Sequence, residues 1–136
     1  MTPAEKAHIA RTKYFAGCLP CLLKGWDNCH ADYHHHVEGY RRGHLFGFGM
    51  CLWHHRGDLD VFWTLPRDQV IERIGPSFAL DKRGFTEMFG TEEQLVALNE
   101  YALELWEAEE WLSFDMPYHV SEKIRQRHRQ HALFAE

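Results

Sequence analysis

The chain has 136 residues, of which 45% are hydrophobic and 26% charged, and this is typical of a single globular domain with its own core. No stretch approaches the ~20 continuous apolar residues that cross a membrane, and the first residues lack the charged-then-apolar pattern of a signal peptide. Length and composition therefore exclude fibrous, disordered and membrane-spanning classes. We expect a cytoplasmic protein.

The net charge of -5 is unevenly distributed along the chain. Residues 1–57 carry seven Lys and Arg against four Asp and Glu, whereas residues 58–136 carry eight against sixteen. An acidic balance argues against a protein that coats nucleic acid nonspecifically. The run from Glu92 to Asp115 has eight carboxylates and no Lys or Arg, and we interpret it as a solvated helix face.

Short strands are predicted only in the first half of the chain. Glycines between residues 38 and 43 supply the turn that a hairpin needs. The predicted elements, in order, are a helix over residues 4–14, two strands over Asp32–Val37 and Phe46–Leu52, and a helical turn that begins at Trp53.

The second half of the chain is predicted to be helical. Pro66 and Gly75 suit the start and the end of a helix, and Thr91 with Gln94 forms a capping-box pair. The predicted helices cover residues 66–74 and 78–89, a long segment from Thr91 that includes Leu112, and a last segment capped by Ser121 that runs through Leu133.

Two ligand pairs at metal-binding spacing occur in this chain, Cys18-x-x-Cys21 and Cys51-x-x-His54. Two residues between ligands let one tight turn place both on a single ion, and two such pairs complete a tetrahedral zinc site. We therefore predict a structural zinc ion held by these four side chains. Cys29 leaves an alternative open, because it can replace one of the four ligands or be an ordinary buried thiol, and we favour the thiol.

Histidines are concentrated beside these cysteines, with most of the eleven between residues 30 and 55. A closed zinc site has no open coordination position, so the triple His34-His35-His36 and His55 require another role. Phosphodiester hydrolysis uses an imidazole base and a cation, which these residues can supply. On a regular strand His34 and His36 share a face and His35 lies opposite, and spacing alone does not decide which histidine is base and which is ligand.

The order CxxC, His-His plus an aliphatic residue, a glycine-rich loop and CxxHH resembles the HNH nuclease superfamily with its ββα-metal core. The stretches HHHVEGYRRGHLFGFGMCLWHHRGD and GPSFALDKRGFTEMFGTEEQLVAL are similar to the phage recombination-enhancement nucleases, which are RecA-dependent DNA endonucleases. The resemblance covers roughly residues 16–98. It implies a phage or prophage protein that acts on DNA in the bacterial host cell, with the RecA filament as partner.

Residue by residue, the resemblance implies that His36 is the general base and that His35 and His55 hold a catalytic divalent cation. His44 would position the base or the scissile phosphate. Because His35 replaces the usual aspartate, Mn²⁺, Ni²⁺ or Zn²⁺ suits the site better than Mg²⁺, although all four stay candidates. DNA contacts are expected from three arginines. These are Arg41, Arg42 and Arg56.

We therefore predict a single α+β domain over residues 1–136, with a small zinc-stabilised ββα-metal, HNH-like core at about 16–60 and a helical C-terminal part at about 66–134. Its predicted activity is metal-dependent DNA nicking. The alternative is a non-catalytic zinc module that contacts DNA or a recombination protein. The oligomeric state and the DNA specificity do not follow from the sequence.

Overall fold

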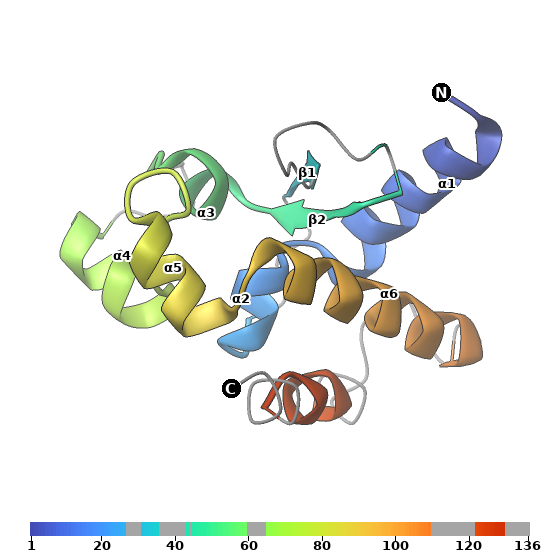
Figure 1. Ribbon diagram of the computed structural model, residues 1–136. Coiled ribbons are helices and arrows are strands. Elements are labelled where there is room, and N and C mark those ends of the chain that lie inside the picture. Colours follow the sequence, from blue (N-terminus) through green and yellow to red (C-terminus); the bar gives the residue numbers. More distant parts are fainter. Residues whose placement is uncertain (27–30, 36–42, 44, 60–64, 110–121, 130–136) are drawn as a thin grey trace.

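The computed structural model describes residues 1–26, 31–35, 43, 45–59, 65–109 and 122–129. Within these ranges the chain is mostly helical with one two-stranded sheet, which confirms the predicted α+β class. The strands lie centrally, with α1 at one side, α3, α4 and α5 at the other, and α6 running along the sheet (Figure 1). None of the helices described has both the length and the apolar composition that a bilayer-crossing span requires.

The first helix, α1 (Pro3–Arg11), begins with a capping box that the sequence analysis did not identify. The backbone N–H of Glu5 donates to the Thr2 hydroxyl, and the Thr2 N–H donates to the Glu5 carboxylate. A π-helical turn, η1 (Thr12–Ala16), continues the helix as far as Gly17. The predicted helix over residues 4–14 is thus present. It starts one residue earlier, at Pro3, and η1 extends it to Ala16.

The predicted hairpin is confirmed: β1 (Asp32–His35) pairs antiparallel with β2 (Gly47–Met50). The second strand is shorter than predicted, because Cys51 is already the N-cap of the helix α3 (Leu52–Arg56). Residues 36 and 37 of the first predicted strand lie outside the described residues. The facing pairs are Asp32 with Met50, Tyr33 with Gly49, His34 with Phe48 and His35 with Gly47.

The predicted helices after the hairpin are present, and the largest difference in a boundary is at the start of α5. The helix predicted to start at residue 78 starts at Lys82, because the Asp81 carboxylate accepts the Gly84 N–H and caps the helix there. Thr91 and Gln94 form the predicted capping box. Leu112, Ser121 and residues 130–133 lie outside the described ranges. The observed helices are α4 (Arg67–Ile74), α5 (Lys82–Phe89), α6 (Glu92–Glu109) and a helix over residues 122–129.

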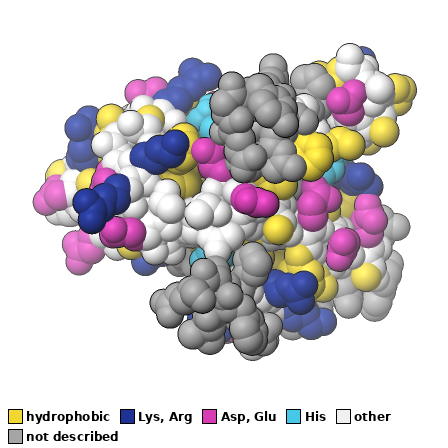
Figure 2. Space-filling view, in the orientation of Figure 1, with side chains coloured by type: hydrophobic (Ala, Val, Ile, Leu, Met, Phe, Trp, Pro, Cys, Tyr) yellow, Lys and Arg dark blue, Asp and Glu magenta, His cyan; other side chains and the backbone are white. Residues whose placement is uncertain are grey.

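The long helix α6 covers the buried strand β2 with its apolar face. Leu95 and Ala102 are fully buried there, and Asn99 donates from Nδ2 to the Thr12 hydroxyl at 3.2 Å and to the Gly47 carbonyl at 3.4 Å. This buried amide joins α6, η1 and β2. Acidic side chains gather over α6 on the right of the face in Figure 2. Among the acidic side chains of α6 that the structure describes, all but Glu92 are exposed, as the predicted solvated face requires.

Gly49 of β2 lies against the backbone of Gly17, the residue that follows η1. A Cβ at this position would lie 2.0 Å from the Gly17 carbonyl oxygen, a backbone atom that cannot move aside as a side chain can. We predict that Gly49→Ala lowers the free energy of unfolding by about 1 to 3 kcal/mol, as overpacking of a core does. Urea unfolding followed by circular dichroism measures this. Unchanged stability would contradict the close approach of these two segments.

Candidate metal centre and neighbouring histidines

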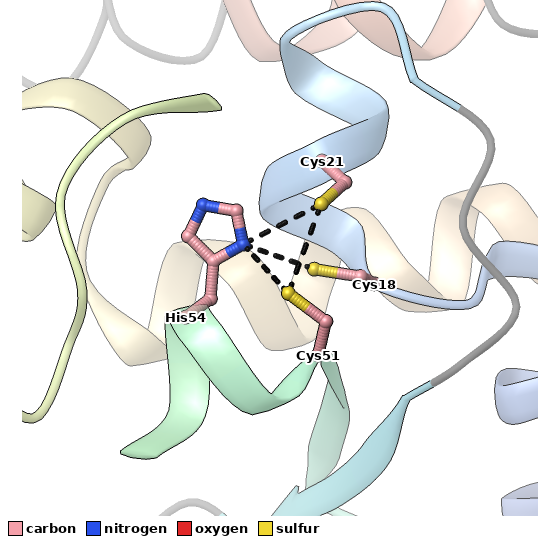
Figure 3. A group of neighbouring side chains, drawn as sticks. All are labelled: Cys18, Cys21, Cys51 and His54. Carbon is pink, nitrogen blue, oxygen red and sulfur yellow. Dashed lines mark hydrogen bonds between the residues drawn. The ribbon is translucent and has the colours of Figure 1, made fainter. Parts of the chain in front are cut away.

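Four side chains from two separate segments meet in the interior: Cys18, Cys21, Cys51 and His54 (Figure 3). Cys18 is the N-cap of the short helix α2 (Leu19–Leu23) and Cys21 lies within it, while Cys51 caps α3 and His54 lies one turn further on. All four are buried, and their ligand atoms lie within 4.8 Å of one another. These are the four residues that the sequence predicted as one metal site.

The geometry of the cluster fits one tetrahedral ion. His54 Nδ1 lies 3.2 Å from Cys18 Sγ, 3.5 Å from Cys21 Sγ and 3.3 Å from Cys51 Sγ. The Sγ atoms of Cys21 and Cys51 are 3.9 Å apart. Zn–S and Zn–N bonds of about 2.3 and 2.1 Å place tetrahedral ligands about 3.6 Å apart. Three thiols and one imidazole at these separations can bind a metal ion such as zinc.

The electrostatics of the cluster favour a bound cation. Hydrogen bonds from the Cys18 and Cys21 thiols lower the pKa of the Cys51 thiol well below its usual range, whereas burial raises the pKa of the Cys18 thiol. One thiolate is thus stabilised by its neighbours, and further thiolates are opposed by desolvation. A dication at the centre would supply the positive charge that three buried thiolates need.

An outer layer of hydrogen bonds fixes His54. Its Nε2–H donates to the Ile74 carbonyl at 2.7 Å, which leaves Nδ1 free to face the three sulfur atoms. The neighbouring Trp53 donates from Nε1 to the Gly75 carbonyl at 2.9 Å, and the Phe78 N–H donates to the His54 carbonyl at 2.8 Å. These hydrogen bonds connect the end of α4 and the residues that follow it to α3. Sequence reasoning missed this partner, because no local pattern links residues twenty positions apart.

A second group of titratable side chains lies where β1 meets α3. The imidazole rings of His34 and His55 are 5.4 Å apart and edge-on. The resemblance paired His55 with His35, but the His35 ring packs edge-on against Tyr33 at 5.0 Å. Alternation along β1 accounts for this, because Asp32 and His34 share one face and Tyr33 and His35 the other. The structure therefore brings the ring of His34 to the ring of His55.

Carboxylates contact both rings of this pair. Glu92 Oε2 lies 3.0 Å from His34 Nε2, and Asp32 Oδ2 lies 3.5 Å from His55 Nδ1. Arg56 Nη2 approaches the same Asp32 oxygen at 3.8 Å. The sequence analysis assigned Glu92 to a solvated face and Asp32 to no site. For Asp32 a signal existed, since it precedes His34 by two residues in a strand and so shares its face.

Several predicted site residues lie outside the described part of the chain. These are His36, His44, Arg41, Arg42 and the alternative ligand Cys29. Their predicted roles stay predictions. Arg56 is described, and its side chain is 62% exposed at the end of α3, as a DNA contact would need to be.

Comparison with known proteins finds a match to one family. The family model described as "Recombination enhancement, RecA-dependent nuclease" matches residues 2–105. This segment holds both strands, the Cys/His cluster, the His34–His55 pair and most of α6. Neither the curated proteins nor the solved structures include a match to the chain.

Proposed function

The chain belongs to the recombination-enhancement, RecA-dependent nuclease family, and on this basis we propose that it is a metal-dependent DNA endonuclease that nicks DNA by hydrolysing phosphodiester bonds. The observation that carries the proposal is the extent of the family match, which spans residues 2–105 and with them every described candidate ligand. We propose further that β1, β2 and α3 form an HNH-like ββα-metal core. The strand, strand, helix order supports this.

In this proposal the Cys/His cluster is a structural zinc site. Cys18, Cys21, Cys51 and His54 complete a tetrahedral set, so no position is left for water or substrate. The cluster instead joins α2 to α3 at the end of the hairpin. It would thereby fix the position of His55, the next residue along α3, relative to β1.

The reaction we propose is attack of water on the scissile phosphorus. His36 takes the proton from the water, the new P–O bond forms, and the bond to the leaving oxygen breaks. His44 positions the base or the phosphate. A divalent cation held by His55 would stabilise the charge on the phosphate and on the leaving oxygen, and imidazole ligands suit Mn²⁺, Ni²⁺ or Zn²⁺ better than Mg²⁺. The resemblance adds His35 as the second ligand, although β1 places His35 on the face opposite His34.

A plasmid-nicking assay tests this function. The zinc-loaded chain is incubated with supercoiled plasmid and added Mg²⁺, Mn²⁺ or Ni²⁺, with and without RecA filaments. We expect relaxed circles only when a divalent cation is present, and a dependence on RecA would identify the filament as the partner. Binding of DNA or RecA without nicking under all of these conditions would favour the non-catalytic zinc module instead.

The proposed DNA contacts are Arg41, Arg42 and Arg56. We predict that Arg56→Ala weakens DNA binding several-fold and lowers the slope of log K against log salt by about one, because one phosphate contact is lost. Arg83→Ala is the matched control, since Arg83 is 91% exposed on α5 and pairs with Glu87. Fluorescence anisotropy at several salt concentrations measures both variants. Equal effects of the two substitutions would remove Arg56 from the interface.

A further inference from the structure

Two histidine–carboxylate pairs lie side by side where three elements meet. Strand β1 supplies Asp32 and His34, helix α3 supplies His55, and helix α6 supplies Glu92. The His34 and Glu92 side chains are only 15% and 14% exposed, and their 3.0 Å contact is the shorter of the two. A hydrogen bond between two nearly buried groups holds both in one position, because water does not compete for either.

Glu92 is an exception within the acidic run of α6. Glu100 and Glu107 have side chains 48% and 51% exposed, where Glu100 contacts the buried His8 ring and Glu107 pairs with Arg11. Glu93, the next residue, is also exposed. Of these four carboxylates, Glu92 has the least exposed side chain, at 14%. The Glu92 carboxylate therefore binds one specific partner, His34, and contributes little to the charged surface of the helix.

The two contacts determine which nitrogen of each ring carries a proton. An ionised carboxylate accepts hydrogen bonds and donates none, so His55 donates from Nδ1 and His34 donates from Nε2. In its neutral form His55 then has its lone pair on Nε2. The His34 ring is held in addition between Phe48 at 5.3 Å and Phe78 at 5.1 Å, and its contact with His55 limits the rotation of that second ring.

We propose that Asp32 and the His34–Glu92 pair are positioning residues for His55, and that they hold it as the Nδ1-protonated tautomer with Nε2 free to bind a divalent cation. Histidine ligands commonly donate their other ring N–H to a carboxylate, and loss of such a partner lowers metal affinity or activity about 10- to 100-fold. This inference rests on the proposed function for the role of His55 as a cation ligand. It assigns His34 and Glu92 to the cation site as positioning residues.

The experiment uses the zinc-loaded chain and Mn²⁺ alone as the probe. Long-range ¹H–¹⁵N spectra of the imidazoles, with His55 assigned from its loss in His55→Ala, report the tautomer without added Mn²⁺. Paramagnetic resonance of free Mn²⁺ gives the binding constant. The variants are Asp32→Ala, Glu92→Ala and Glu92→Gln. Glu93→Ala is the matched control, because it removes the neighbouring exposed carboxylate from the same helix turn.

We expect the Nδ1–H tautomer of His55 in the unsubstituted chain. Asp32→Ala and Glu92→Ala should each weaken Mn²⁺ binding about 10-fold or more, Glu93→Ala should not, and Glu92→Gln should recover most of the affinity because its amide oxygen still accepts from His34. A proton on Nε2 of His55, or Mn²⁺ affinities in the alanine variants equal to that of Glu93→Ala, would overturn the inference.

These readouts separate this inference from the proposed activity. The tautomer and the Mn²⁺ affinity are measured without DNA, so a chain that shows both expected results but nicks no plasmid would contradict the endonuclease alone. Should Asp32→Ala fail to fold, the tautomer in the unsubstituted chain and the Glu92 variants still decide the outcome.

Discussion

Cys51→Ser is expected to leave the chain insoluble or without fixed tertiary structure, and Cys18→Ser should have the same effect. A structural zinc ion contributes on the order of 10 kcal/mol to folding, which is comparable to the total stability of a domain, about 5 to 15 kcal/mol. The loss is large here because the ligands join two segments, one at α2 and one at α3, that are about thirty residues apart. Without the ion, three buried thiols would remain at the centre of the cluster.

Elemental analysis and near-ultraviolet circular dichroism measure this outcome. The chain purified without chelator should hold one zinc ion, and neither serine variant should show an ordered aromatic signal. Cys29→Ser is the control, since we predict an ordinary thiol at that position and expect full zinc content. A well-folded Cys51→Ser protein, or less than one zinc ion per chain, would remove the structural zinc site, and loss of zinc from Cys29→Ser would place Cys29 among the ligands.

The parts of the site that could be predicted from the sequence are those set by short-range spacing. Cys18 and Cys21 are brought together by one turn of chain, as are Cys51 and His54. The ligand types and their spacing in the sequence are therefore sufficient to predict the cluster. The hairpin and the capping box at Thr91 have the same origin. Where one local interaction determines the structure, the sequence pattern shows it directly.

Contacts between distant segments could not be predicted in this way. Helical periodicity places Glu92 in an amphipathic helix, but it does not show that the start of this helix contacts His34, 58 residues earlier in the chain. The same holds for the His54 contact with Ile74. The contact between His55 and His34 depends on which face of β1 turns toward α3. The family resemblance names His35 as the partner of His55 at the cation, and it does not indicate that His34 lies beside His55.

Two predicted element boundaries differ from the structure. The predicted second strand runs to Leu52, whereas β2 ends at Met50 and Cys51 is already the N-cap of α3. Asp81 similarly delays the start of α5, and the preceding residues form a turn that places Phe78 against His34. Both boundaries lie beside the candidate site. Contacts between distant segments override the local propensity of the chain there.

His36→Ala is expected to abolish DNA nicking while the chain keeps its zinc, its stability and its affinity for added metal. Loss of a general base slows a reaction by about 10² to 10⁴ without disturbing the fold. His35→Ala and His55→Ala should behave differently, because removal of a metal ligand weakens cation binding. Part of their activity should return at high Mn²⁺ concentration, whereas no cation concentration replaces a missing base.

Nicking rates measured over a range of Mn²⁺ concentrations distinguish these cases, and His34→Ala extends the series. If His34 positions His55, its loss should raise the Mn²⁺ requirement and excess cation should partly restore the rate. A His34→Ala variant that is inactive at every Mn²⁺ concentration, beside a fully active His36→Ala, would show that the base is His34 and that the resemblance assigns the wrong register. If none of the four substitutions altered an activity present in the unsubstituted chain, catalysis would lie elsewhere, and the zinc cluster beside this pair would be the scaffold of a binding module.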